Sequence, residues 1–289
     1  MFVVMGATGQ VGGAVIEALK QRRQPVRAVA RDPARAAHLG VDTVRGDASD
    51  AATLAAALKE AQAAFVMLVP PLQAADVLAE SRAMAATIAA AVRAARVPHL
   101  VALSSVGAQL ASGTGIVQAL HGFETALAGA APSIVFLRPG YFMENWAALL
   151  PAAREGGVLP SAHDPLDAKG EIVSALDVGR TAAALLSEPQ PGTRIVDLAG
   201  PAEYSAVDAA AILSKLLGKP VSAGPMSRGE QIAGLLAAGL GADYAAKLAD
   251  LDEAANAGRM AFPPGGDLRR GTVTLEEALM RLVRGTPVR

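Results

Sequence analysis

Short apolar runs alternate with segments of helical periodicity along the first half of this chain. Continuous apolar runs are typical of parallel strands that are buried on both faces, whereas the segments between them place apolar residues at helical spacing. We therefore expect an α/β fold with a Rossmann-type, doubly wound parallel sheet. The strands are expected at residues 2–5, 26–31, 43–45, 64–69, 99–105 and 134–138.

The alternation loosens after Leu150. Residues 151–170 are rich in proline and glycine and are expected to be irregular. We divide the chain into a Rossmann domain at 1–150, with segments at about 172–200 returning to it, and a smaller α+β part, mainly 151–289. In that part the pattern predicts strands at 172–176 and 194–199. It predicts helices at 178–187, 206–217, near 230–256 and near 274–283. Asp177 is expected to cap the first of these helices and Ser205 the second.

Glycines follow the first apolar run at a fixed spacing. Gly6, Gly9 and Gly12 lie between a predicted strand and a predicted helix. In dinucleotide-binding units the first glycine permits the tight turn, the second lets the backbone approach the pyrophosphate, and the third lets the helix pack closely on the strand. The helix N-terminus then faces the phosphates. We prefer this interpretation to a purely structural turn, and expect Thr8, Gln10 and Val11 to contact the NAD(P) cofactor as well.

The end of the second strand bears on the choice of cofactor. A carboxylate there binds the 2′-hydroxyl of NAD, and an arginine accommodates the 2′-phosphate of NADP. Here Arg31 comes first and Asp32 follows. Because a guanidinium matches a phosphate in a planar, bidentate way, we favour NADP(H) over NAD(H). The alternative is a solvated Arg31 with Asp32 capping a short helix from Pro33, and both interpretations can hold together.

Further cofactor contacts are expected at the carboxyl ends of the following strands, where such sheets bind ligands. Asp47 lies at the carboxyl end of the third strand and could reach the adenine. Helix capping is the alternative for this segment and applies best to Ser49 and Asp50, which come later. The fourth strand ends in Val69 and two prolines, which cannot continue a strand. We place Val69 and Pro70 against the cofactor, together with Ser104 at the end of the fifth strand.

The sixth strand runs into the one cluster of aromatic residues, in a chain that is only 3% aromatic. The cluster stands at the carboxyl end of a strand, so we expect a pocket wall there rather than simple core filling. The expected substrate-binding residues are Pro71, Leu72, Tyr141, Phe142, Asn145 and Trp146.

Composition narrows the function classes. The 289 residues are 52% hydrophobic and carry a net charge of −1. The protein therefore has no net positive charge that would attract nucleic acid or an anionic membrane. The absence of cysteine excludes disulfides, thiolate metal sites and a cysteine nucleophile. We find neither a signal-type segment nor a membrane-spanning run and expect a cytoplasmic protein without metal.

Three pieces of the sequence together resemble the NmrA-like branch of the atypical short-chain dehydrogenase/reductases. They are Gly-Ala-Thr-Gly-Gln-Val-Gly-Gly at 6–13, His-Gly-Phe-Glu at 121–124 and Leu-Arg-Pro-Gly-Tyr-Phe-Met-Glu-Asn at 137–145. Within the branch the chain looks most like NAD(P)H-dependent quinone oxidoreductases and azoreductases. The resemblance implies hydride transfer from NADPH to a small, flat, conjugated substrate without a flavin, by a monomer or homodimer.

The chain departs from the wider family at its usual catalytic pair, Tyr-x-x-x-Lys. Tyr141, Tyr204 and Tyr244 are each followed four residues later by a residue other than lysine. In the quinone-reductase relatives a histidine occurs near the nicotinamide, at the place of His121, and an imidazole can donate a proton or position a substrate oxygen. His121 is therefore our catalytic candidate, and a surface helix pair with Glu124 is the alternative.

The missing tyrosine–lysine pair leaves two functions open. Quinones and azo bonds accept a hydride readily, so a site that only orients substrate and nicotinamide can still be an enzyme. A non-catalytic dinucleotide sensor of the NmrA type would lack the same pair. Sugar-nucleotide epimerases and benzylic-ether or isoflavone-type reductases fit less well, because they use residues of the pair that this chain lacks.

Overall fold

The computed structural model describes residues 1–286, and its centre is an eight-stranded sheet in which every pair of neighbours is parallel. The order confirms the Rossmann-type expectation, because the chain winds outward in both directions from β1 and β4. Across the sheet the strands are β13 (Asp267–Arg270), β10 (Gly192–Ala199), β6 (Ser133–Pro139), β5 (His99–Leu103), β4 (Ala63–Met67), β1 (Phe2–Val4), β2 (Val26–Ala30) and β3 (Asp42–Arg45).

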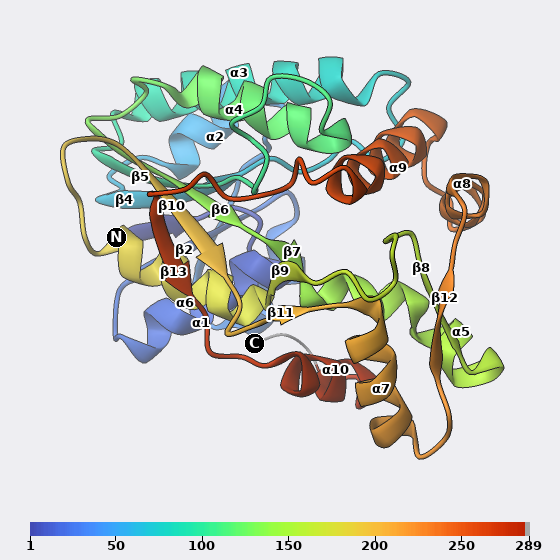
Figure 1. Ribbon diagram of the computed structural model, residues 1–289. Helices are drawn as coiled ribbons and strands as arrows, with labels where there is room; N and C mark the ends of the chain where they lie inside the picture. Colours follow the sequence, from blue (N-terminus) through green and yellow to red (C-terminus); the bar gives the residue numbers. More distant parts are fainter. Residues whose placement is uncertain (287–289) are drawn as a thin grey trace.

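Helices cover both faces of this sheet (Figure 1). On one face lie α2 (Ala51–Ala57), α3 (Val77–Ala95) and α4 (Gln118–Leu127); on the other lie α1 (Gln10–Gln21) and α6 (Ala175–Leu186). The apolar strand residues alternate between two buried clusters, one beneath each helical layer: Val4 and Phe65 face α1 and α6, whereas Val3 and Val66 face α2 to α4. This two-sided burial explains why the strands read as continuous apolar runs.

A smaller lobe follows β6 and has its own apolar cluster, which contains Met143, Leu159 and Leu213. Its strands form two small sheets, β7 (Tyr141–Phe142) with β9 (Gly170–Val173) and β11 (Glu203–Tyr204), and β8 (Val158–Ser161) with β12 (Ser222–Pro225). Its helices are α5 (Leu150–Gly156), α7 (Ala206–Leu217), α8 (Arg228–Ala237), α9 (Ala242–Asn256) and α10 (Leu275–Val283). Short 3₁₀ segments complete the chain: η1 (Pro33–Leu39), η2 (Gly115–Val117) and η3 (Met143–Leu149).

Four expectations for the second half need correction. Residues 151–170 contain most of α5 and all of β8, the helical region 230–256 is broken at 238–241, and the sheet gains the strand β13. Ser174, not Asp177, caps α6. Asp177 is buried and accepts hydrogen bonds from the backbone N–H groups of Thr272 and Val273, at 2.8 and 2.7 Å. The expected cap of α7 by Ser205 is confirmed. The division of the chain near residue 150 stays a prediction.

The turn between β1 and α1 brings two stretches of backbone into close contact. A Cβ atom added to Gly12 would lie 2.2 Å from the carbonyl oxygen of Gly6, whereas one added to Gly13 would lie 3.7 Å from the carbonyl oxygen of Ala7, an ordinary van der Waals contact. Gly6 adopts a φ of +67°, which favours glycine. Glycine at position 12 is therefore required for α1 to start this close to the sheet.

Helix α4 is fixed to the sheet by a buried ion pair. The Arg138 guanidinium on β6 donates two hydrogen bonds to the Glu124 carboxylate, at 2.8 and 2.6 Å, and Ser104 donates a third at 2.5 Å. The two charged side chains are only 5% and 11% exposed. Asp197 lies opposite Arg138 on β10, and burial raises the pKa of its carboxyl although the Arg138 charge opposes that shift. The pair determines where His121, one turn before Glu124, is held.

We expect Gly12→Ala to lower the free energy of unfolding by about 1–3 kcal/mol, because the added methyl group overlaps backbone that cannot turn away. Gly13→Ala is the matched control, one residue along the same helix. It is expected to be neutral or to stabilise by about 0.5–1 kcal/mol, since alanine favours a helix more than glycine does. Denaturant unfolding of both variants measures the difference, and equal midpoints would contradict the proposed contact.

We expect Glu124→Ala to destabilise the protein by about 3–5 kcal/mol, because it leaves the buried Arg138 charge without its bidentate partner. Glu17→Ala, which removes an exposed pair with Lys20, should cost less than about 1 kcal/mol. Thermal and denaturant unfolding check both values. A loss at position 124 no larger than that at position 17 would show that the ion pair does not hold α4.

Candidate functional site

The N-terminus of α1 faces the edge of the sheet without a side-chain cap. Its cap residue is Gly9, no side chain accepts from its first N–H groups, and its first turn carries no acidic residue. In contrast, α2, α3, α6, α7, α8 and α10 all have a Ser, Thr or Asp cap. Thr8, Gly9 and Gln10 are exposed, whereas Val11 and Gly12 are buried. Bare, exposed N–H groups at the switch point between β1 and β4 fit a dinucleotide pyrophosphate.

The residues expected at the adenosine end lie together after β2 and β3. Asp32 accepts a hydrogen bond from Ala34 N at 3.0 Å and so caps η1, while Arg31 is exposed. Asp47 accepts two hydrogen bonds from Ser49, and these lower the pKa of its carboxyl, with a smaller contribution from the nearby Arg31 charge. Of these side chains, the Arg31 guanidinium is best suited to a phosphate.

The loop after β4 combines exposed apolar side chains with a fixed backbone. Val69 and Leu72 are 39% and 44% exposed. The Leu72 carbonyl accepts from Gly241 N at 2.8 Å, Gln73 donates to the Gly239 carbonyl, and Asp243 accepts from Val77 N. The turn between α8 and α9 therefore holds this loop at the carboxyl edge of the sheet, with apolar side chains, including those of Pro70 and Pro71, on its outer surface.

His121 is held by the loop that follows β5. Its Nδ1 lies 2.9 Å from the Ala108 carbonyl oxygen, which can only accept, so Nδ1 carries the proton and Nε2 is left for a ligand. Ala108 belongs to a small apolar cluster with Val117 and Leu251, against which Tyr141 also packs. Tyr141, one expected pocket residue, thus packs against the cluster whose member Ala108 holds the catalytic candidate His121. Ser104, by contrast, uses its hydroxyl proton on Glu124, a structural role that the sequence did not indicate.

The aromatic run after β6 does not form one wall, because neighbouring residues enter different environments. The Tyr141 hydroxyl donates to Asp252 Oδ1 on α9 at 3.2 Å, and burial, with the Asp252 charge, raises the pKa of this phenol. Tyr141 is therefore a poor proton donor at neutral pH. Phe142 packs against the Rossmann core, and Asn145 is exposed.

Trp146 is the most buried of the residues expected at the pocket, and its place in a pocket stays a prediction. It is only 8% exposed and belongs to the apolar cluster of the smaller lobe, because η3 turns its side chain into that core. Glu144, which the sequence analysis did not assign, is buried and accepts from Ser174 Oγ at 2.7 Å and Ala175 N at 3.0 Å. This carboxylate fixes the start of α6, and only its place within the 137–145 motif could have marked it.

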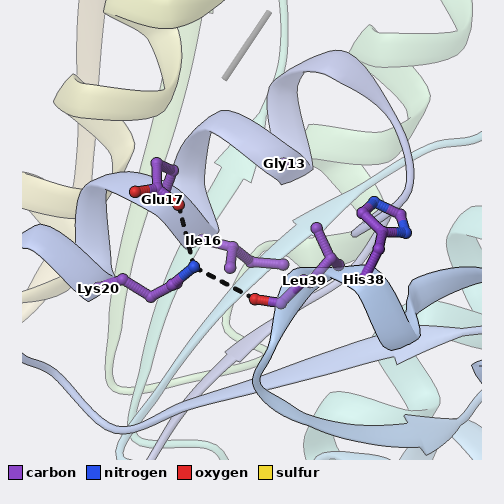
Figure 2. Close-up of a pocket in the computed structure, with 6 residues that line it drawn as sticks. All are labelled: Gly13, Ile16, Glu17, Lys20, His38 and Leu39. Atoms are coloured by element: carbon purple, nitrogen blue, oxygen red, sulfur yellow. Dashed lines mark hydrogen bonds and ion pairs between the residues drawn. The ribbon is translucent and has the colours of Figure 1, made fainter. Parts of the chain in front are cut away.

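Two hollows accompany these residues. A pocket of about 50 Å³ lies between α1 and η1, where Lys20 reaches Glu17 and the Leu39 carbonyl (Figure 2). It is too small for a conjugated ring system and lies away from His121 and Tyr141 in the chain and in the fold. A larger pocket of about 300 Å³ lies between the β5–α4 loop and α9, and Gln118, one turn before His121, lines it.

Within residues 1–286 no group of three or more His, Asp or Glu side chains is placed to bind a metal ion. The same residues include no helix that combines the length and the apolar character needed to cross a membrane.

Comparisons with known proteins agree with this arrangement. The NAD(P)H azoreductase of Xenophilus azovorans is 32% identical over 227 residues, which cover 76% of this chain and 75% of that protein. Quinone oxidoreductase 2 of Escherichia coli (strain K12) is 31% identical over 293 residues, with 98% of each chain covered. The crystal structure of the NADPH-dependent quinone oxidoreductase of Escherichia coli complexed with NADPH matches 98% of this chain and 100% of that chain, with a TM-score of 0.81 and 29% identity.

The model of the NmrA-like family matches residues 1–257, which is most of the chain. The uncapped glycine turn, the sheet order and the relatives over nearly the full length all agree with that match. The protein belongs to the NmrA-like family.

Proposed function

We propose that this protein is an NADPH-dependent reductase that transfers a hydride to a flat conjugated acceptor, either a quinone or an azo compound. The observation that carries the proposal is the uncapped N-terminus of α1 at an edge of the sheet that also presents apolar side chains and Nε2 of His121. The chain contains no cysteine that could act in their place. The names of the relatives, an azoreductase and a quinone oxidoreductase, support the same reaction class.

The chain's own residues bind and orient in this proposal. The bound nicotinamide supplies the hydride. The glycine turn holds the pyrophosphate, Arg31 holds the 2′-phosphate, and Val69 and Pro70 flank the cofactor. Pro71, Leu72, Tyr141 and Phe142 exclude water from one side of the substrate, and Asn145 provides a polar contact. One hydride and one proton convert a quinone into a hydroquinone. The proton comes from water, or from His121 Nε2 when the ring carries a second proton besides the one on Nδ1.

Steady-state oxidation of NADPH with a panel of quinones and azo compounds tests the proposal. Turnover with at least one acceptor class is the expected result. Tight binding of NADPH without turnover of any acceptor would overturn it and favour the sensor alternative. Among the described residues, no specific structural feature favours that alternative.

We expect Arg31→Ala to weaken NADPH binding by roughly tenfold to a hundredfold while leaving NADH nearly unchanged, because a charge-assisted contact contributes about 1.5–3 kcal/mol. The alternative ribose ligand, Asp32, is already engaged in capping η1. Arg269→Ala, on β13 at the opposite edge of the sheet, is the control and should change neither affinity. Fluorescence titration with both cofactors measures the effect, and equal losses for NADPH and NADH would exclude Arg31 as the phosphate ligand.

We expect His121→Ala to lower kcat by roughly 10²–10⁴-fold if the imidazole donates the proton, and by less where water replaces it. His121→Gln keeps a donor for the Ala108 carbonyl but cannot transfer a proton at neutral pH. A kcat as low as that of His121→Ala would indicate proton transfer, and a restored kcat would indicate positioning. Wild-type kcat in His121→Ala would remove the residue from the site.

A further inference from the structure

A second histidine stands beside the Tyr141 ring. His163, in the loop after β8, meets this ring edge-on, with centroids 5.8 Å apart and planes at 75°. The imidazole is partly exposed, and within residues 1–286 neither of its ring nitrogens makes a hydrogen bond. His99, in contrast, is buried with both ring nitrogens bonded, to Ser133 and to the Leu185 carbonyl. His163 therefore has a free donor next to a residue at the carboxyl edge of the sheet.

The backbone on both sides of His163 is held by one side chain. Asn256, the last residue of α9, donates to the Ala162 carbonyl at 2.8 Å and accepts from Asp164 N at 3.1 Å. The N–H of His163 itself donates to Ser161 Oγ at 3.1 Å. These contacts fix the backbone from which the His163 imidazole projects.

The same helix fixes the ring that His163 contacts. Asp252 lies one turn before Asn256 on α9, so both side chains share a face of the helix. The Asp252 carboxylate is 5% exposed and accepts from the Tyr141 hydroxyl and from Gln231 Nε2. Burial raises the pKa of this carboxyl, which Gln231, His163 and Tyr141 partly offset. A buried polar group held by two donors positions its partners strongly, because leaving any of them unpaired is costly.

We propose that His163 is a substrate-contacting residue, whose ring N–H donates a hydrogen bond to the heteroatom of the conjugated acceptor, a quinone oxygen or an azo nitrogen. The inference rests on the proposed function and adds a polar recognition group to it. Tyr141 contributes its ring as an apolar wall and spends its hydroxyl on Asp252, so it cannot serve as that donor. Apolar pockets need a few placed polar groups to orient their ligands, and His163 supplies one on the side of the smaller lobe.

Steady-state kinetics with 2-methyl-1,4-naphthoquinone and NADPH test this role. His163→Ala should raise the KM for the quinone roughly threefold to tenfold, the effect of losing one hydrogen bond, with the KM for NADPH unchanged. His163→Gln, which keeps an N–H donor, should recover part of the loss. Asn256→Ala should act in the same direction by releasing the loop. His38→Ala, on η1, is the matched histidine control and should match the wild type.

An unchanged quinone KM in His163→Ala would overturn the proposal. A parallel rise in the KM for NADPH would do the same, because it would indicate a general structural defect. Failure of the proposed function can be told apart from failure of this contact. If the wild type oxidises no NADPH with any acceptor, calorimetry measures binding of the same quinone to the NADP⁺ complex instead of turnover. Equal dissociation constants for the wild type and His163→Ala would then overturn the contact, and a threefold to tenfold weaker variant would support it. Thermal melting verifies that each variant is folded.

Discussion

The close approach of two backbone segments at the start of α1 is the constraint on which the rest of the site depends. The Gly6 carbonyl occupies the space where a side chain at position 12 would begin, so α1 starts against the sheet instead of standing off it. This closeness leaves the first N–H groups of the helix at the switch point of the sheet, where sheets of this kind bind ligands. A second close contact of this kind joins α1 to α6. A Cβ atom added to Gly179 of α6 would lie 2.4 Å from the methyl group of Ala14 on α1.

The second organising element is α9, which contacts several segments that are far apart in the sequence. Its N-terminal turn holds the backbone of residues 72–77, its Asp252 holds Tyr141, and its Asn256 holds the loop of His163. Residues just beyond it cover the β5–α4 loop, where Gln109 donates to the Ala261 carbonyl at 3.1 Å. A single helix of the smaller lobe thus sets the relative positions of groups that come from four separate parts of the chain.

The sequence predicted the Rossmann half well because its signals are local. Apolar runs, the glycine spacing and the caps at Asp32 and Asp50 each depend on residues that are neighbours in the chain. The roles of Asp177, Glu144 and Trp146 could not be read in this way. Each depends on a partner thirty or more residues away or on the direction in which a turn sends the side chain. His163 gave no signal at all, because its significance comes from Tyr141 and Asn256, which only the fold brings near it.

The interleaving of the two halves has a consequence for how this protein can be divided. β10 and β13 come from the second half of the chain and complete one side of the main sheet. The buried carboxylate of Asp177 pairs with Arg180 on its own helix and accepts two hydrogen bonds from the backbone at 272–273. A fragment that ends near residue 150 would expose a whole edge of β6 and would lack α6, the helix that packs on α1. The smaller lobe is therefore not a module that can be exchanged by cutting the gene at one point. Transplanting it as a unit would require several crossovers, because the chain returns to the main sheet at β10 and again at β13.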